Sequence, residues 1–261
     1  MSSGRRIGNA SRTGLLPLGA AALAAALLAP ITEGAAASYQ VLYKFCSQSG
    51  CADGAFPRAG LIIDAAGNLY GTTLRGGSAG LAAGRGVVFR LAPDGTETVL
   101  HDFCSSGVCP DGEPAASLTI DGFGNFYGTT IGGGGAANSG VVFALTRRLP
   151  EFGGYRYRVL YRFCALSGCA DGMNPSAELI MDAAANLYGT TYQGSTSGGG
   201  VVFKLAPDGT ETVLYSFCSQ FNCADGDHPS AGLIMDGAGN LYGTTLGGGT
   251  SGTGVVFMVT P

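Results

Sequence analysis

The stretch "AGLIIDAAGNLYGTTLRGGSAGLAAGRGVVFRLAPDGTETVLHDF", residues 59–103, holds four short apolar runs separated by turn-forming residues. The runs cover 59–64, 68–73, 86–91 and 96–103, and their β-branched and aromatic residues favour strands. In the turns "AAGN" and "APDGT", Pro presets φ while Gly and Asn accept positive φ. The continuous runs "GLII" and "GVVF" fit strands buried on both faces. Together these features predict four antiparallel strands.

The same unit recurs at a spacing of 54 to 61 residues. The motif "N-L/F-YGTT" begins at Asn68, Asn125, Asn186 and Asn240, and "GVVF" begins at Gly86, Gly140, Gly200 and Gly254. Four-stranded units that repeat and pack between their neighbours are the signature of β-propeller blades.

The strand count predicts how the ring closes. The first strand, "YQVLYKF" (39–45), matches the fourth strand of a unit, and the last, "GVVFMVT" (254–260), matches the third. We therefore predict an all-β fold, a β-propeller of four blades of four antiparallel strands, closed by the N-terminal strand completing the last blade. A half-ring that pairs with another copy of the chain is the alternative.

The N-terminus has the features of an export signal. Arg5, Arg6 and Arg12 precede an apolar run over 14–30, and the small residues of 34–38 suit cleavage near Ala37. We predict a signal peptide over 1–37 and a single propeller domain of four repeats of about 57 residues over 38–261. The protein would then be secreted, extracellular or periplasmic, with no membrane span after cleavage. An uncleaved membrane anchor is the alternative.

Composition excludes some classes of partner. Of 261 residues, 46% are hydrophobic, which fits a packed core, and the net charge of −4 lacks the basic footprint that nucleic acid requires.

The pattern "CADG…P…GLI.D..GNLYGTT..GG…G.GVVF.L.PDGTETVLY.F" resembles the GloVer-type tandem repeat of exported bacterial proteins, and four copies cover 39–261. The resemblance implies an extracellular or surface repeat protein, often attached by a C-terminal anchor. It implies no particular enzymatic activity. This chain stops at Pro261, directly after the last strand, so we expect free secretion rather than anchoring.

All eight cysteines lie in C-x4-C pairs, an even and regular usage that in an exported chain predicts disulfides. The pairs are Cys46/Cys51, Cys104/Cys109, Cys164/Cys169 and Cys218/Cys223. Zinc needs four ligands for each ion, and redox sites prefer C-x-x-C near positive charge, so both alternatives fit less well. The bridges would lie on the same face as the long, glycine-rich loops between second and third strands, where function is expected.

Candidate ligand-binding residues lie on this loop face. An aspartate follows each cysteine pair: Asp53, Asp111, Asp171 and Asp225. A ring of four carboxylates suits Ca2+, whereas capping of each Asp-Gly turn is the interpretation we favour. Arg75, His228 and the insert over 147–157, which falls in a turn on the opposite face, break the four-fold pattern and could mark a unique site. A longer solvated hairpin and a surface histidine without a role are the interpretations we favour for the insert and for His228.

These observations predict a function without catalysis. We expect a monomeric binding or structural module, with no cofactor except Ca2+, that presents the disulfide-stapled loop face to an extracellular glycan or protein. The alternative is an enzyme acting on extracellular polysaccharide, a lyase or hydrolase that recruits His228, Asp225, Asp227 and Arg75.

Overall fold

The computed structural model describes residues 37–105, 112–134, 137–148 and 153–261. The chain divides into two units, Met1–Gln40 and Val41–Pro261. The described part of the first unit, residues 37–40, contains neither helix nor strand. The predicted signal peptide, apart from residue 37, lies outside the described residues.

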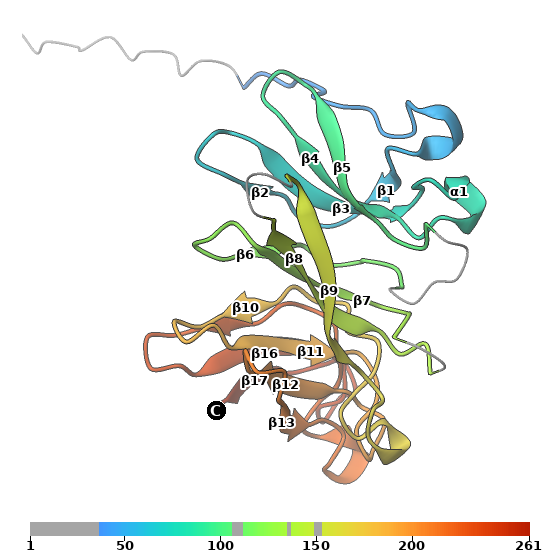
Figure 1. Ribbon diagram of the computed structural model, residues 1–261. Coiled ribbons are helices and arrows are strands. Elements are labelled where there is room, and N and C mark those ends of the chain that lie inside the picture. The colour runs from blue at the N-terminus through green and yellow to red at the C-terminus, as the bar shows by residue number, and fades with distance from the viewer. Residues whose placement is uncertain (1–36, 106–111, 135–136, 149–152) are drawn as a thin grey trace, which may run out of the picture. The chain divides into compact units, whose positions relative to one another are not determined.

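Four antiparallel sheets form the four blades of a β-propeller, as predicted (Figure 1). The first blade contains β1 (Ala55–Pro57), β2 (Ile62–Ile63), β3 (Leu69–Arg75), β4 (Val87–Leu91) and β5 (Glu97–Asp102). The second contains β6 (Thr119–Ile120), β7 (Phe126–Thr130), β8 (Val141–Arg147) and β9 (Tyr155–Arg162). The third contains β10 (Ile180–Met181), β11 (Leu187–Thr191), β12 (Val201–Leu205) and β13 (Glu211–Ser216). The fourth contains β14 (Asp227–Pro229), β15 (Ile234–Met235), β16 (Leu241–Gly247) and β17 (Val256–Val259).

The innermost strand of each blade is shorter than the predicted run. In the first blade β1 pairs with one end of β3, Ala55 opposite Arg75, and β2 pairs with the other end, Ile62 opposite Tyr70. Pro57 ends β1, and a proline has no N–H for a sheet ladder. The fourth blade repeats this arrangement, with β14 and β15 both paired to β16.

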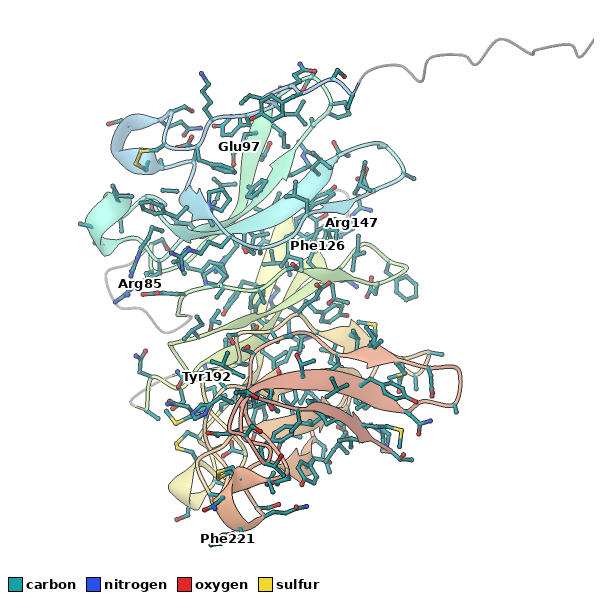
Figure 2. The ribbon with its side chains drawn as sticks, turned by 180° about the vertical axis from the view of Figure 1, so that it is seen from behind. Arg85, Glu97, Phe126, Arg147, Tyr192 and Phe221 are labelled. Carbon is teal, nitrogen blue, oxygen red and sulfur yellow. A yellow bond between two sulfur atoms is a disulfide. The ribbon has the colours of Figure 1, made fainter. Side chains whose placement is uncertain are left out.

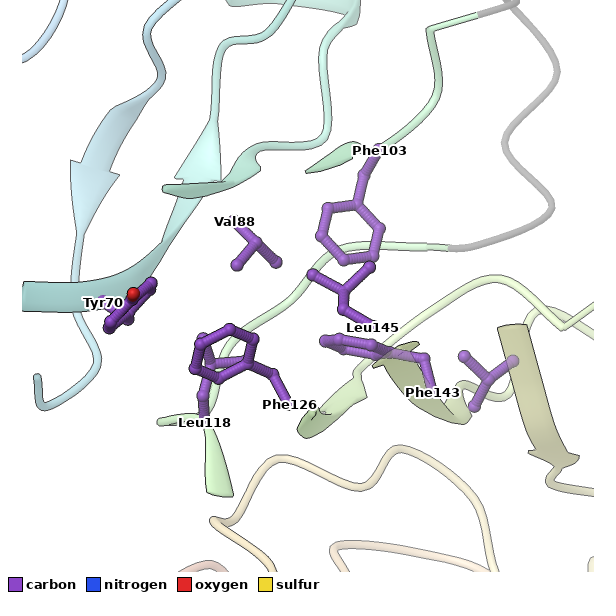
Figure 3. Packing of buried hydrophobic residues seen from close by; sticks show 8 residues of the cluster. Tyr70, Val88, Phe103, Leu118, Phe126, Phe143 and Leu145 are labelled. Atoms are coloured by element: carbon purple, nitrogen blue, oxygen red, sulfur yellow. The ribbon is translucent and has the colours of Figure 1, made fainter. Parts of the chain in front are cut away.

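The hydrophobic core lies between successive blades. Val88 of the first blade packs against Leu118 and Phe126 of the second, and Phe103, directly after β5, packs edge-on against Phe143 (Figure 3). Phe163 makes the same contact with Phe203, and Phe217 with Phe257. Both valines of each "GVVF" run are fully buried in the first three blades, which confirms that these strands are covered on both faces.

Closure by the N-terminal strand is the part of the fold prediction that the structure contradicts. Residues 41–45 form no strand, and on this chain nothing in the described residues pairs with the outer edge of β17. The segment packs instead on the first blade, where Phe45 contacts Phe89 with ring centroids 4.8 Å apart. The segment packs on the first blade as an outer strand would. Because β17 does not lie beside it, the segment has no neighbouring strand with which to form backbone hydrogen bonds.

Among the described residues, helix occurs only in the long first loop and inside cysteine loops. A one-turn helix, α1 (Gly80–Ala83), lies in the long first loop, and three 3-10 turns, η1 (Ser49–Cys51), η2 (Ser167–Cys169) and η3 (Phe221–Cys223), lie inside cysteine loops. Within the ranges that the structure describes, no helix is both long and apolar enough to cross a membrane.

Candidate functional site

The cysteine loops are stapled as predicted. Disulfides join Cys46 to Cys51, Cys164 to Cys169 and Cys218 to Cys223. Cys104 is also disulfide-bonded, but Cys109 lies outside the described residues. The bridges at Cys164 and Cys218 each close a six-residue loop between the outer strand of one blade and the inner strand of the next, and the Cys46–Cys51 bridge closes the loop between segment 41–45 and β1. The staples therefore fix the geometry of the connections between blades.

The aspartates after the cysteines serve their own loops. Asp53 is fully buried, and its carboxylate accepts hydrogen bonds from the Tyr43 hydroxyl at 2.9 Å, from the Ser47 N–H and hydroxyl, and from the Gln48 N–H. Although burial opposes ionisation, the hydrogen bonds from Ser47 and Tyr43 hold the pKa of Asp53 below its usual value. Asp225 makes the same contacts, with Tyr215 and Ser219 in the place of Tyr43 and Ser47. Asp171 accepts from the Tyr161 hydroxyl and from two backbone N–H groups, but Ala165 offers it no hydroxyl.

This arrangement agrees with the loop-capping interpretation. Asp111 lies outside the described residues, and in the remainder no three His, Cys, Asp or Glu side chains gather as a metal site would require. Ca2+ binding by these aspartates stays a prediction. Such binding would have to replace hydrogen bonds that the carboxylates already accept.

Arg75 joins the first blade to the second. Its guanidinium donates to Glu113 Oε1 at 2.9 Å, and Arg85 forms a second ion pair with the same oxygen. Arg75 lies in β3, whereas Glu113 follows the second cysteine loop. The triad therefore fixes the long first loop to the second blade and retains one positive charge on the loop face.

His228 also lies at a junction between blades. Its Nδ1 is 2.7 Å from Asp227 Oδ2, and its ring lies 4.6 Å from that of Tyr192 in the third blade. Figure 2 shows Tyr192 on the same side as Arg85 and Phe221, the side of the loop face. The structure thus separates His228 from Arg75: one joins the third and fourth blades, the other the first and second.

A different site opens on the opposite side, where Arg147 lies in Figure 2. A hollow of about 980 Å³ lies between the first and second blades. Its polar lining includes Asp64, Tyr70, Arg90, Arg147, Arg148 and Tyr155. This hollow includes residues of the insert, which the sequence marked as breaking the pattern without showing what it faced.

The insert builds the hollow by lengthening one hairpin. Strands β8 and β9 continue past the length of their counterparts, pairing Thr146 with Arg156 and Arg147 with Tyr155. The extension places Tyr155 against Phe126, with ring centroids 5.3 Å apart, and Phe126 in turn lies 4.6 Å from Tyr70 of the first blade. The aromatic row forms an apolar floor beside the arginines.

The hollow is positively charged in an acidic protein. Three guanidinium groups face one carboxylate, Asp64, which accepts hydrogen bonds from Asn68 and from the Tyr70 hydroxyl. These hydrogen bonds lower the pKa of Asp64 to about 2, and the bond from the Asn68 side chain has the largest effect. The carboxylate therefore stays ionised and hydrogen-bonded to these two residues. Arg90 Nε is buried and has no hydrogen-bond partner among the described residues. Burial raises the pKa of Tyr70 to about 12 and also raises that of Tyr155, so both hydroxyls stay protonated.

The signal for this hollow is present in the sequence, but only after alignment of the repeats. Arg90 occupies the position of Ala144, Lys204 and Met258 in the other blades. Two blades thus carry a cation there, yet only the insert adds Arg147 and Tyr155 beside it. Arg90 and the insert lie in different blades and meet only because those blades are neighbours. Residue spacing alone could not have predicted that they line one hollow.

Comparison with known proteins supports the repeat assignment. A model of the Gloeobacter/Verrucomicrobia repeat matches residues 31–168 and 151–261. No curated protein matches. Among solved structures, a protein provisionally described as a gluconolactonase is 21% identical, with a TM-score of 0.42 over 76% of this chain and 56% of that one. A protein from Thermus thermophilus described as an oxidoreductase (glucose dehydrogenase) is 18% identical, with a TM-score of 0.47 over 79% of this chain and 62% of that one. The chain thus spans less than two thirds of the length of either structure.

Proposed function

This chain belongs to the Gloeobacter/Verrucomicrobia repeat family, and we propose that it is an exported, non-catalytic module that binds an acidic glycan between its first and second blades. The loop face holds the blades in place through its staples and ion pairs. The hollow on the other side receives the ligand.

The observation that carries the proposal is the positive, aromatic-floored hollow lined by Arg90, Arg147 and Tyr155. Guanidinium groups bind carboxylates through paired charge-assisted hydrogen bonds, and Arg90, Arg147 and Arg148 all line the hollow. Sugar rings pack on aromatic faces, and protonated tyrosine hydroxyls donate to sugar oxygens. A polysaccharide containing uronic acids combines these groups.

The disulfides support an oxidising location. Bridges of this kind persist in extracellular and periplasmic compartments and are rare in the cytosol. An extracellular or periplasmic site would also give the module access to acidic polysaccharide.

One contact favours the alternative of a polysaccharide-active enzyme. His228 lies 2.7 Å from Asp227, an orientation that suits a general base. The nearby Asp225, however, already accepts hydrogen bonds from the Tyr215 and Ser219 hydroxyls. It would have to give up these bonds to act as the second carboxylate of such an enzyme. If the chain cleaves a polysaccharide through this pair, His228→Ala will abolish product release, as measured by reducing-end and unsaturated-product assays.

Calorimetry with oligouronates and with neutral oligosaccharides of equal length tests the binding proposal. We expect binding of the oligouronate alone, weakened about tenfold or more by Arg90→Gln or Arg147→Gln, since one charge-assisted hydrogen bond contributes about 1.5–3 kcal/mol. Arg58→Gln removes an exposed charge that does not line the hollow and is the matched control. Equal binding of neutral and acidic sugars, or equal loss in the control, would refute the proposal. Melting curves with Ca2+ and with EDTA, run in parallel, test the aspartates as metal ligands.

A further inference from the structure

Three blade junctions inside the chain are built from the same contacts. A threonine of the second strand donates its hydroxyl proton to an alanine carbonyl of the next blade: Thr72 to Ala116, Thr129 to Ala177 and Thr190 to Ala231. A valine of the third strand and a leucine at the start of the next blade are buried beside it. These residues are Val88, Val142 and Val202, and Leu118, Leu179 and Leu233, none more than 3% exposed.

The two ends of the blade series carry the two halves of a fourth junction, unassembled. On the last blade Val256, which corresponds to Val88, is 80% exposed, and Thr244 is exposed as well. On the first blade Leu61, which corresponds to Leu118, is 55% exposed. In the described residues no hydrophobic cluster joins the first blade to the last.

The segment 41–45 is already seated as the outer strand of a preceding blade. Phe45 packs edge-on against Phe89, as Phe163 does against Phe203. The Tyr43 hydroxyl donates to Asp53, and the Cys46 N–H donates to the Gly54 carbonyl at 3.0 Å, matching the later junctions. The segment lacks the rest of its blade. Phe163 donates its N–H to the Gly140 carbonyl and Phe217 to the Gly200 carbonyl, whereas Phe45 donates to no such carbonyl among the described residues.

We propose that a second copy of the chain supplies this blade. Segment 41–45 of each copy pairs with the free edge of β17 in the other, so the two copies close head to tail into one ring of eight blades. The internal repeats fix the register: Val41 opposite Phe257, Tyr43 opposite Val256 and Lys44 opposite Val255, with the usual bulge between the first two pairs. The Phe45 N–H then donates to the Gly254 carbonyl, and Thr244 donates to the Ala59 carbonyl.

A second copy fits better than the same chain for a structural reason. The three internal junctions assemble within one chain, yet in the described residues segment 41–45 and β17 of that chain do not pair, and both terminal faces stay exposed. The same junction can therefore form between the terminal faces of two molecules. An exposed apolar strand edge is a template for pairing, and reciprocal pairing in a two-fold dimer satisfies both edges at once.

Light scattering coupled to size exclusion measures the mass of the oxidised protein. We expect twice the chain mass, and the mass of one chain for Val256→Glu, which places a charge in the junction. Phe123→Glu is the matched control and should remain a dimer. Phe123 is 84% exposed in the turn between β6 and β7 of the second blade, which is not a terminal blade. Circular dichroism of each variant checks that the blades are folded.

Cross-linking separates the second copy from closure within one chain. A Lys44→Cys chain mixed with a Val255→Cys chain should form a disulfide-linked heterodimer, because these positions face each other directly in the proposed register. A monomer whose doubly substituted chain cross-links internally would overturn the proposal in favour of self-closure. A monomer without any cross-link, or filaments in place of dimers, would overturn it outright.

Discussion

Two buried glutamates should make the protein less stable as the pH rises towards neutrality. Glu211 at the start of β13 and Glu97 at the start of β5 occupy the same place in their blades. Each side chain is half-buried, and its Oε1 has no hydrogen-bond partner among the described residues. Burial, reinforced by the charges of Asp171 and Asp53 respectively, raises the pKa of each carboxyl from 4.5 to about 7. The perturbation is the double change Glu97→Gln and Glu211→Gln, which keeps the shape of the protonated acid.

The sign follows from proton uptake. Between pH 4.5 and 7 the folded chain holds protons on these carboxyls that the unfolded chain has released, so the free energy of unfolding falls as the pH rises through 7. A pKa of about 7 in place of 4.5 corresponds to an upper bound of about 3 kcal/mol for each group. Because solvent reaches part of each side chain, we expect about 1–2 kcal/mol each after screening.

Urea unfolding at pH 5 and pH 8 measures the effect. The unaltered protein should lose about 2–4 kcal/mol of unfolding free energy over this range, and the double variant should lose almost none. Exposed Glu178→Gln is the control and should keep the full slope. An undiminished slope in the double variant would refute the reasoning. The aspartates act in another window: despite burial, hydrogen bonds from Ser219 and Tyr215 lower the pKa of Asp225 to about 2, so its contribution is lost only as the pH falls below 3.8.

Two further predictions concern the repeat itself. Gly189→Ala should destabilise the third blade by about 1–3 kcal/mol, because a Cβ there would lie 2.8 Å from both Leu179 and Phe203, whereas Gly237→Ala, with no atom within 4 Å of its Cβ, should change the melting temperature little. Replacing Cys218 and Cys223 together by serine should lower the free energy of unfolding by about 2 kcal/mol, the chain-entropy value for a six-residue loop; an unchanged denaturation midpoint would show that the bridge does not constrain the unfolded chain.

The repeats made the blades predictable because each motif has a local physical reason. "AGN" and "PDG" form turns through their own backbone preferences. The "GVVF" runs of the first three blades are buried on both faces as predicted, but the "GLII" run is not, since Leu61 is 55% and Ile63 68% exposed. Asp64 caps its turn by accepting from the Ala66 and Asn68 N–H groups, a contact four residues long that spacing alone can indicate. Ring closure depends on distant parts of the chain, and matching strand types could not determine whether one molecule or two would bring them together.

Contacts between blades follow a rule that becomes visible only when the repeats are superposed. At two places a tyrosine just before a blade is matched by a glutamate at the start of that blade's outer strand. Tyr43 is matched by Glu97 of the first blade, and Tyr161 by Glu211 of the third. At the junction between the first and second blades His101 takes the place of the tyrosine, and Tyr157 takes that of the glutamate.

There the two rings stack, with centroids 4.1 Å apart and planes 4° apart. The tyrosine and the glutamate are thus both replaced at this junction, and the two new rings pack against each other. A glutamate in the place of Tyr157 would have no tyrosine beside it, because His101 stands at that position. The junction that differs is also the one that carries the insert and the positive hollow. Several departures from four-fold repetition therefore meet at this junction, as expected if it binds a ligand, while His228 marks a separate departure between the third and fourth blades.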